Sequence, residues 1–376
     1  MKKIVSLLLV ILMAVGMLTA CAPTENTTTP EAVVETESAA PEESTAETEA
    51  TTAEITQPVT FDNLAEAGKA GYEWAKANGK KYKIGVSWYS QTTEFMACCK
   101  YYMQKYVDEN YGDVVELVHL DGDANSANQL DQISNLIAQG CDAILHNPFD
   151  KEQNAPGTLE CYEAGIPCIE FNCSTTVGDD KRTTYVGSDH VYSGELLAEA
   201  LVKAGGENAK WLVIDGVIGQ DGQIGRIQGM NNVLANYPGI EIVGQKACNW
   251  VRDEAIAFVE NAVTAGLEFD VVFALCDDMG LGAQIAVKDT PYEDKVVIGS
   301  VDGLAAGVQA VRDGGNYYCT VFQNGQKQAE GSLDAALAAL AGYKIDTFIN
   351  VPYELVTAEN VDDPAYDTSE AQAGLH

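Results

Sequence analysis

Basic residues are scarce in this chain of 376 residues, in which 22 lysines and arginines stand against 56 aspartates and glutamates. The resulting formal net charge of -34 repels phosphate backbones and anionic lipid headgroups. We therefore expect no nucleic-acid partner. The hydrophobic content of 46% is enough for a large core, and the length suits two domains once the N-terminal region is set aside.

Residue patterns for catalysis and cofactor binding are also missing. The chain has no G-x-S-x-G motif, and zinc-like spacing is absent among its four histidines: His119, His146, His190 and His376. Gly216, Gly219 and Gly222 do not form the G-x-G-x-x-G of a dinucleotide loop. We expect neither an enzyme nor a bound cofactor.

One acidic segment begins like a calcium loop, with Asp121, Asp123 and Asn125. Gln132 stands where such a loop needs its bidentate glutamate. We interpret these residues as the cap of the following helix and expect no metal site.

The ten cysteines lack a C-x-x-C motif and are spread through the chain without the spacing of a disulfide framework. If Cys21 is lipidated, nine remain, which is an odd number. We expect most thiols to be free and to act as small buried hydrophobic groups.

The N-terminal segment, residues 1–21, has Lys2 and Lys3, an apolar run and then Leu18-Thr19-Ala20-Cys21. The small residues before Cys21 resemble the lipobox of bacterial lipoproteins, in which the cysteine is diacylated and becomes the mature N-terminus. A transmembrane anchor is the alternative, but the run is short for a span and no positive cluster follows it. We predict a lipoprotein signal peptide, lipidation at Cys21 and an extracytoplasmic protein anchored to the cell membrane.

The next segment, residues 22–60, is rich in Thr, Glu, Ala and Pro and too poor in large apolar residues to fold. We predict a disordered acidic tether. Residues 61–80 then predict a leading helix, with Asp62 or Asn63 as its cap and Gly79 as its stop, and the folded body is expected to begin at Lys81.

Strand and helix patterns alternate in two sets after Lys81. Predicted strands are 84–88, 114–120, 142–146, 167–171 and 185–186, then 211–214, 240–243, 271–275 and 296–298, and finally 317–321 and 353–357. Such alternation implies parallel sheets built from right-handed crossovers. The predicted fold is α/β, with two doubly wound parallel-sheet lobes joined by a three-strand hinge.

The stretch 165–199 predicts a crossing between the lobes, with Ser188 and Asp189 as cap of the helix that follows. The alternative is a strand-loop-strand inside one domain. The predicted domains are an N-terminal lobe (81–187 and 324–351), a C-terminal lobe (188–323 and 352–359) and an acidic tail (360–376).

Several ungapped blocks resemble the sugar-binding proteins of bacterial ABC importers, the ribose and glucose/galactose group of type 1 periplasmic binding proteins. The blocks are IGVSWYSQTTEFM (84–96), GIPCIEFN (165–172), YVGSDHVYSG (185–194), GRIQGM (225–230), CNWVRDEA (248–255), CDDMGLGA (276–283), VDGL (301–304) and TVFQNGQ (320–326). The resemblance implies a monomer that captures a monosaccharide, a hexose or pentose, between two lobes and delivers it to ABC permease subunits.

The resemblance also implies ligand contacts at ten positions: Tyr89, Thr93, Phe95, Asn172, Gln220, Arg226, Trp250, Cys276, Asp302 and Gln323. Thr93 stands where the glucose/galactose binders have an aspartate, and Cys276 replaces an asparagine. Gln220 and Gly222 replace a histidine and an aspartate, and the family's calcium loop has no counterpart before Trp211. These departures leave the sugar open, with a polyol or a nucleoside as further candidates.

The residue types suit a sugar, whose hydroxyls donate and accept and whose ring faces are weakly polar. Phe95 and Trp250 can sandwich a ring, and Arg226 can fork onto two adjacent hydroxyls, with Asp302 and Asn172 opposite. Considered one at a time, these residues have simpler structural interpretations: Phe95 as a core residue, Arg226 as a surface charge and Asp302 as a turn residue. Their joint occurrence at the ends of predicted parallel strands favours a site.

Other classes of protein compete with a transport protein. A sensor, which presents its closed form to a receptor kinase or chemoreceptor, uses the same fold, and nothing in the chain separates it from a transport protein. A hydrolase needs a catalytic constellation that is not recognisable here, and an adhesin more often shows repeats. The repressors of sugar operons share the fold of the sugar-binding proteins, but they need a helix-turn-helix headpiece where this chain has the predicted signal peptide.

The lipobox interpretation depends on the thiol of Cys21. We expect Cys21→Ser to release or misprocess the protein while its soluble body stays folded. Membrane fractionation with a lipid label tests this expectation. Unchanged membrane retention, together with no lipid label in the wild type, would contradict it.

Overall fold

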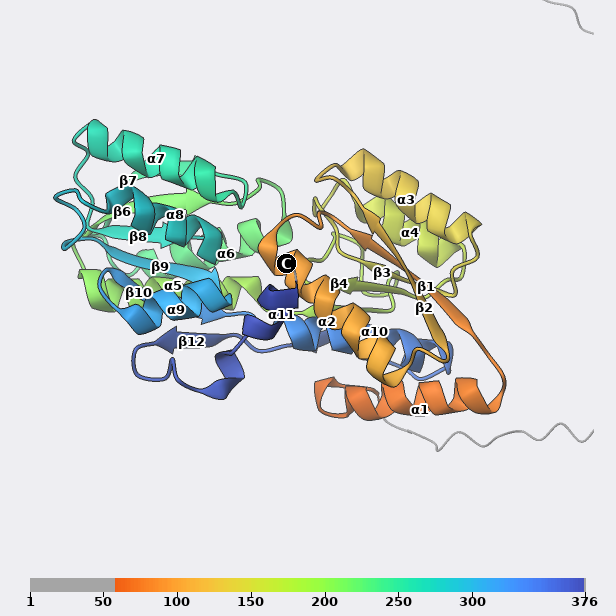
Figure 1. Cartoon of the computed structure of the whole chain (residues 1–376). Coiled ribbons are helices and arrows are strands. Elements are labelled where there is room, and N and C mark those ends of the chain that lie inside the picture. Colours follow the sequence, from red (N-terminus) through yellow and green to blue (C-terminus); the bar gives the residue numbers. More distant parts are fainter. Residues whose placement is uncertain (1–57, 375–376) are drawn as a thin grey trace, which may run out of the picture. The chain divides into compact units, whose positions relative to one another are not determined.

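The computed structural model describes residues 58–374, so the predicted signal peptide, the lipidation site Cys21 and most of the predicted tether lie outside it. No helix in this part of the chain is long and apolar enough to cross a bilayer. Two α/β lobes are present, each built on a sheet of six strands (Figure 1). The predicted two-lobed α/β fold is confirmed.

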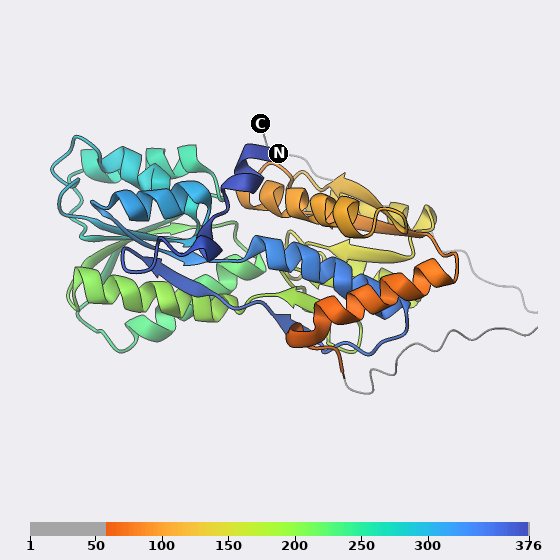
Figure 2. The ribbon, with the colours of Figure 1, turned by 60° about the horizontal axis from the view of Figure 1, so that its bottom comes forward.

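The first lobe has a sheet with the strand order β11-β5-β4-β3-β1-β2, and all its strand pairs are parallel. Helices α1, α2 and α10 pack on one face of this sheet, and α3 and α4 pack on the other (Figures 1 and 2). The elements are α1 (Leu64–Ala77), β1 (Tyr82–Trp88), α2 (Glu94–Asn110), β2 (Val115–Asp121), α3 (Ser126–Ala138), β3 (Ala143–His146), α4 (Ala155–Glu163), β4 (Cys168–Phe171), β5 (Thr184–Gly187), α10 (Gly325–Leu340) and β11 (Phe348–Asn350).

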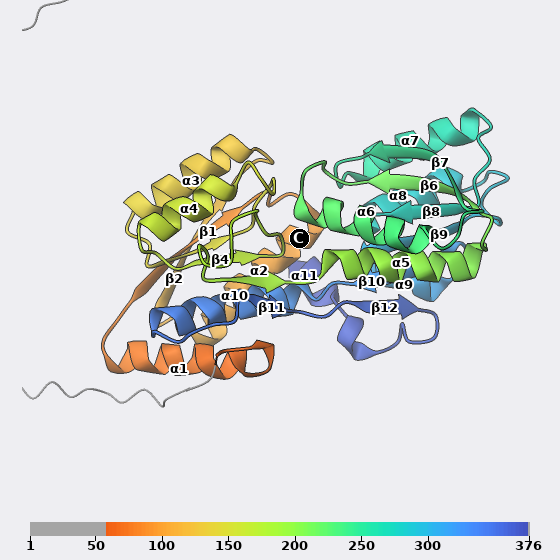
Figure 3. The ribbon, with the colours of Figure 1, turned by 180° about the vertical axis from the view of Figure 1, so that it is seen from behind.

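The second lobe repeats this plan with the order β12-β10-β9-β8-β6-β7, in which only the edge strand β12 runs antiparallel. Helices α5 and α6 lie together, and α7, α8 and α9 form the other layer (Figure 3). The elements are α5 (His190–Gly205), β6 (Lys210–Asp215), α6 (Asp221–Leu234), β7 (Glu241–Ala247), α7 (Arg252–Thr264), β8 (Val271–Ala274), α8 (Asp277–Val287), β9 (Val297–Asp302), α9 (Ala305–Asp313), β10 (Tyr317–Phe322) and β12 (Glu354–Thr357).

The chain passes between the two sheets from β5 to α5, from β10 to α10 and from β11 to β12. Tyr353 of the third passage is hydrogen-bonded to His190 just after the first and to Gln323 in the second. Asp189 caps α5 as predicted, because its carboxylate accepts from the backbone amides of Val191 and Tyr192 at 3.0 and 3.1 Å. The three passages between the lobes therefore share one buried polar cluster.

The folded body begins earlier than the sequence predicted. Val59 is fully buried, and its amide donates to the carbonyl of Lys344 at 2.8 Å. The predicted tether end at residue 60 and the predicted body start at Lys81 are therefore wrong: the backbone of Val59 finds its partners in the first lobe, and α1 packs against α10. Strand β11 was also not predicted, since three residues give too short a pattern.

Two local interpretations agree with the structure. Asn125 caps α3, accepting from the amide of Asn128 at 3.1 Å, as expected from the residues that begin like a calcium loop. Nine cysteines within residues 58–374 are buried and carry free thiols. Burial raises the pKa of the Cys98 thiol to about 12, so this sulfur behaves as an apolar group.

A buried acid ties α10 to its neighbours in the first lobe. Asp334 is 2% exposed and accepts from the hydroxyls of Tyr111 at 2.8 Å and Tyr106 at 3.1 Å. Gly68 of α1 lies directly against it, and a Cβ there would come within 2.3 Å of the carboxylate. Burial raises the pKa of Asp334 to about 7, against the lowering effect of the two hydroxyl donors.

This pKa sets the sign of a pH effect on stability. Between pH 4 and 7 the native Asp334 holds a proton that the unfolded chain has lost, so its contribution to the free energy of unfolding falls as the pH rises. We expect the wild type to lose about 2 to 4 kcal/mol relative to Asp334→Asn over this range. Urea unfolding from pH 4.5 to 7.5 measures it, with Asp108→Asn, an exposed acid on α2, as the control. Parallel pH profiles for the wild type and Asp334→Asn would contradict the assignment.

Candidate functional site

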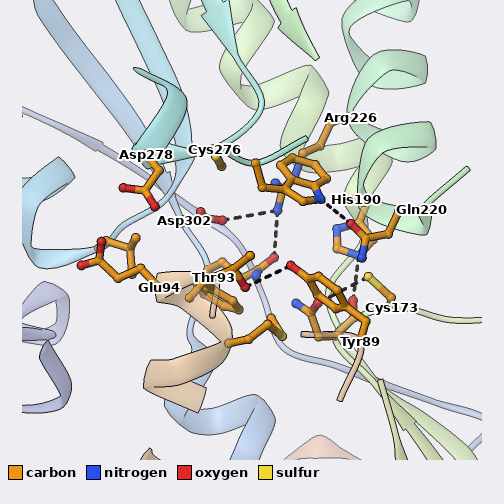
Figure 4. A pocket seen from close by; sticks show the side chains of 17 residues that line it. Tyr89, Thr93, Glu94, Cys173, His190, Gln220, Arg226, Cys276, Asp278 and Asp302 are labelled. Carbon is orange, nitrogen blue, oxygen red and sulfur yellow. Dashed lines mark hydrogen bonds and ion pairs between the residues drawn. The ribbon is translucent and has the colours of Figure 1, made fainter. Parts of the chain in front are cut away.

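A pocket opens between the carboxyl ends of the two sheets, with about 490 Å³ of empty space (Figure 4). All ten positions named from the sequence line it, and they come from both lobes. The lining residues are Tyr89, Thr93, Glu94, Phe95, Met96, Asn172, Cys173, His190, Gln220, Gly222, Arg226, Trp250, Cys276, Asp278, Asp302, Leu304 and Gln323.

Several lining residues adopt backbone conformations that L-amino acids rarely use. Asn172, which follows β4, has φ of 60°, Trp250 after β7 has 65°, and Asp302 at the end of β9 has 133°. Such values cost of order 1–3 kcal/mol each and persist only where the surroundings enforce them. They turn these three side chains away from the path of their strands.

Trp250 is held in place by its neighbours in the second lobe. Its ring lies on Gly216, where a Cβ would come within 2.1 Å of the indole, so only glycine leaves room for this ring position. The indole nitrogen donates to the Gln220 side-chain oxygen at 2.6 Å. The amide nitrogen of Gln220 is buried and has no hydrogen-bond partner among the described residues, which leaves a donor available.

Arg226 lies at the centre of the second-lobe wall and is only 4% exposed. Its guanidinium donates to the carbonyl of Leu275 at 2.5 Å and to the Gln323 side chain at 3.1 Å, and it lies 3.7 Å from the Asp302 carboxylate. Its carbon centre lies 5.7 Å from the ring centre of Trp250. The Arg226 Nε is buried without a partner in the described structure, so one donor of the fork is unused. The surface-charge interpretation of this arginine is wrong.

The first-lobe wall is organised around Asn172. Its backbone carbonyl accepts from the Tyr185 hydroxyl at 2.7 Å and from the His190 Nε2 at 2.8 Å. Burial lowers the pKa of His190 to about 4, so the ring is neutral. Its Nδ1 lies 2.8 Å from the Tyr353 hydroxyl, which donates its proton to the Gln323 side-chain oxygen. The Asn172 amide is fixed in turn by Gln328 at 3.2 Å.

Two carboxylates lie together beneath the second-lobe wall. Burial raises the pKa of Asp302 well above its usual range, although the Arg226 guanidinium opposes this effect. Asp277 is fully buried, with its pKa raised to about 6 by burial, and it accepts from the Thr320 hydroxyl at 2.6 Å and the Leu304 amide at 2.7 Å. Asp277 thereby fixes the loop that carries Asp302.

Seven further lining residues are not among the ten contacts that the resemblance implied, and they include Glu94, His190 and Asp278. Glu94, His190 and Asp278 lie within three of the quoted blocks, and Cys173 directly follows a fourth. Glu94 of the first lobe lies 3.8 Å from the Arg252 guanidinium of the second, which also pairs with Asp278. Burial raises the pKa of Glu94, and the nearby Asp278 adds to the effect.

A second set of contacts joins the lobes on the other side of the pocket. Asp221 at the start of α6 forms an ion pair with Lys151 and accepts from the backbone amide of Ser174 at 2.9 Å and from its hydroxyl at 2.7 Å. Lys151 and Ser174 belong to the first lobe and Asp221 to the second. The two lobes therefore touch on both flanks of the pocket.

Comparisons with known proteins agree with this arrangement. The periplasmic binding protein domain model matches residues 84–344. A xylitol-binding protein of Mycolicibacterium smegmatis is 30% identical, over 76% of this chain and 80% of its own length. The ribose import binding protein of Bacillus subtilis is 27% identical, over 76% of this chain and 92% of its own length.

Among solved structures, an ABC transporter solute-binding protein of Bacillus halodurans with bound myo-inositol is 31% identical, with a TM-score of 0.71. The likeness covers 76% of this chain and 97% of that one. The chain belongs to the periplasmic binding protein family, and its relatives are the sugar-binding proteins of ABC transporters.

The buried contacts of Arg226 predict a cost for its removal. In Arg226→Ala the Leu275 carbonyl, Gln323 and Asp302 lose a charged donor, so we expect the free energy of unfolding to fall by about 3 kcal/mol. Lys210→Ala is the control, because its side chain is 39% exposed and pairs with Glu268 at the surface. That control should lose less than about 1 kcal/mol. Denaturant unfolding measures both free energies of unfolding. Equal values for the two variants would contradict the role given to Arg226.

Proposed function

We propose that this chain is the lipid-anchored, extracytoplasmic solute-binding protein of an ABC importer. It binds one monosaccharide or small polyol in the pocket and delivers it to the permease subunits. It acts as a monomer and catalyses no reaction. The proposed lobes are those predicted from the sequence, with the N-terminal lobe extended back to Val59, and Cys21 carries the lipid.

The single observation that carries the proposal is the convergence of a stacking platform and unused donors in one cavity. Phe95 and Trp250 offer flat apolar faces from different lobes, which suits the C–H faces of a sugar ring. Arg226 Nε and Gln220 Nε2 are buried donors without a protein partner, and hydroxyl oxygens would satisfy both. Neither group can be hydrated freely, because both residues are less than 5% exposed.

The comparisons support the same class of ligand. The related proteins are named for xylitol and ribose, and the Bacillus halodurans protein was solved with myo-inositol. All three compounds are small, neutral and densely hydroxylated.

A thermal-shift screen of the purified full-length protein tests the ligand class. The panel contains xylitol, ribose, arabinose, myo-inositol, hexoses and nucleosides. A ligand that binds only the native state raises the melting temperature, so we expect a rise with at least one monosaccharide or polyol and none with nucleosides. A shift with nucleosides alone, or with no compound of the panel, would overturn the proposed ligand class.

Calorimetry with the best compound then tests the pocket. Trp250→Ala should weaken binding about 30-fold, the size expected when a buried aromatic anchor is removed. Trp74→Ala on α1, a partly buried tryptophan of the first-lobe core outside the pocket, is the matched control and should bind as the wild type does. If both variants bind with wild-type affinity, the ligand site lies elsewhere.

A further inference from the structure

The C-terminal segment does not end in the lobe that it leaves. After β12 ends at Thr357, the chain forms a short 3-10 helix η2 (Pro364–Tyr366) and then the helix α11 (Ser369–Gly374). Helix α11 lies beside the first turns of α2 in the other lobe (Figures 1 and 2). We call residues 358–374 the strap. It follows the last residue matched by the family model, which ends at 344.

One end of the strap is fixed to the second lobe. Tyr366 is 5% exposed, packs edge-on against Phe322 with ring centres 5.2 Å apart, and donates its hydroxyl to Glu354 at 2.8 Å. Val361 is also buried, and its carbonyl accepts from Arg312 at 3.0 Å. These contacts join the strap to the core of the second lobe.

The other end is fixed to the first lobe. Ala371 is fully buried and belongs to the first-lobe core, while Glu370 forms an ion pair with Lys105 of α2. The Tyr101 hydroxyl donates to Glu370 at 3.3 Å, and the ring of Tyr101 leaves no room for a side chain at Gly374. The strap therefore spans the two lobes as a fourth connection, formed by packing.

The strap also reaches the ligand pocket. Gln372 donates a hydrogen bond to the carboxylate of Glu94, the first residue of α2 and part of the pocket lining. A second cavity, with about 420 Å³ of empty space, shares the lining residues Phe95, Asp302, Leu304 and Gln323 with the pocket. The strap residues Ala365, Asp367 and Thr368 also line this cavity.

We propose that the strap is a positioning element of the ligand site, which holds Glu94 through Gln372 and favours the lobe arrangement in which the pocket is complete. The inference rests on the proposed function. Because the strap is packed on both lobes, separating them must break one of its attachments. An element that favours one lobe arrangement increases the affinity of any ligand that binds this arrangement, and the gain equals the free energy of the coupling.

The matched variants Ala371→Asp and Ala373→Asp test the proposal in the full-length protein. Both put the same charge into α11, but Ala371 is buried against the first lobe and Ala373 is exposed. We expect Ala371→Asp to bind the compound found by the screen about 5- to 20-fold more weakly, within the usual range of such couplings. Most of the loss should be faster dissociation, and Ala373→Asp should stay within about twofold of the wild type.

Two further readouts separate positioning from a general loss of stability. Affinities are measured well below the melting temperature of each variant, and hydrogen exchange of residues 364–374 reports whether α11 is released. Gln372→Ala should weaken binding in the same direction while the exchange of the first-lobe core is unchanged. A released helix with wild-type affinity would overturn the proposal, and so would protected α11 amides in Ala371→Asp.

The failure of the strap proposal can be distinguished from failure of the proposed function. Small-angle scattering of the ligand-free proteins should show a larger radius of gyration for Ala371→Asp than for Ala373→Asp, whatever the ligand is. Equal radii with a released α11 would refute the strap even if the wild type binds a polyol. A wild type that binds no compound of the panel would instead refute the ligand class.

Discussion

The buried guanidinium of Arg226 is the interaction on which the rest of the site depends. A cation that is 4% exposed needs partners on every side, and it takes them from the end of β8, from Asp302 and from two of the passages between the lobes. Tyr353 extends the network to His190 beside the remaining passage. The same side chain therefore links two of the passages to the second-lobe wall, and its Nε is buried without a partner among the described residues.

This network lies at the pocket because the carboxyl ends of the strands in both sheets face the pocket. In each lobe the residues after parallel strands turn into the pocket, and unusual backbone angles at Asn172, Trp250 and Asp302 aim their side chains. Neither lobe forms the pocket by itself, since Phe95 belongs to α2 of the first lobe and Trp250 follows β7 of the second. Ligand capture and lobe arrangement are thus one equilibrium.

Much of this could be predicted from the sequence, because the alternation of strands and helices is a local signal and the strand ends carry polar and aromatic residues. The two lobes follow from the alternation, and the ten positions that the resemblance to sugar-binding proteins implied all line one pocket. The burial of Val59 and the docking of Ala371 could not be predicted. Each depends on one small side chain meeting a distant part of the chain, in a segment whose composition looks polar. The role of His190 was missed for a similar reason, since its partners are set by tertiary structure.

The most direct test of the account is a crystal structure of the protein with the compound that gives the largest thermal shift. The account predicts a ring between Phe95 and Trp250, with hydroxyl oxygens about 3 Å from Arg226 Nε and Gln220 Nε2, the two donors that lack partners in residues 58–374. A ligand bound outside this pocket, or one that leaves both donors without a partner, would contradict it.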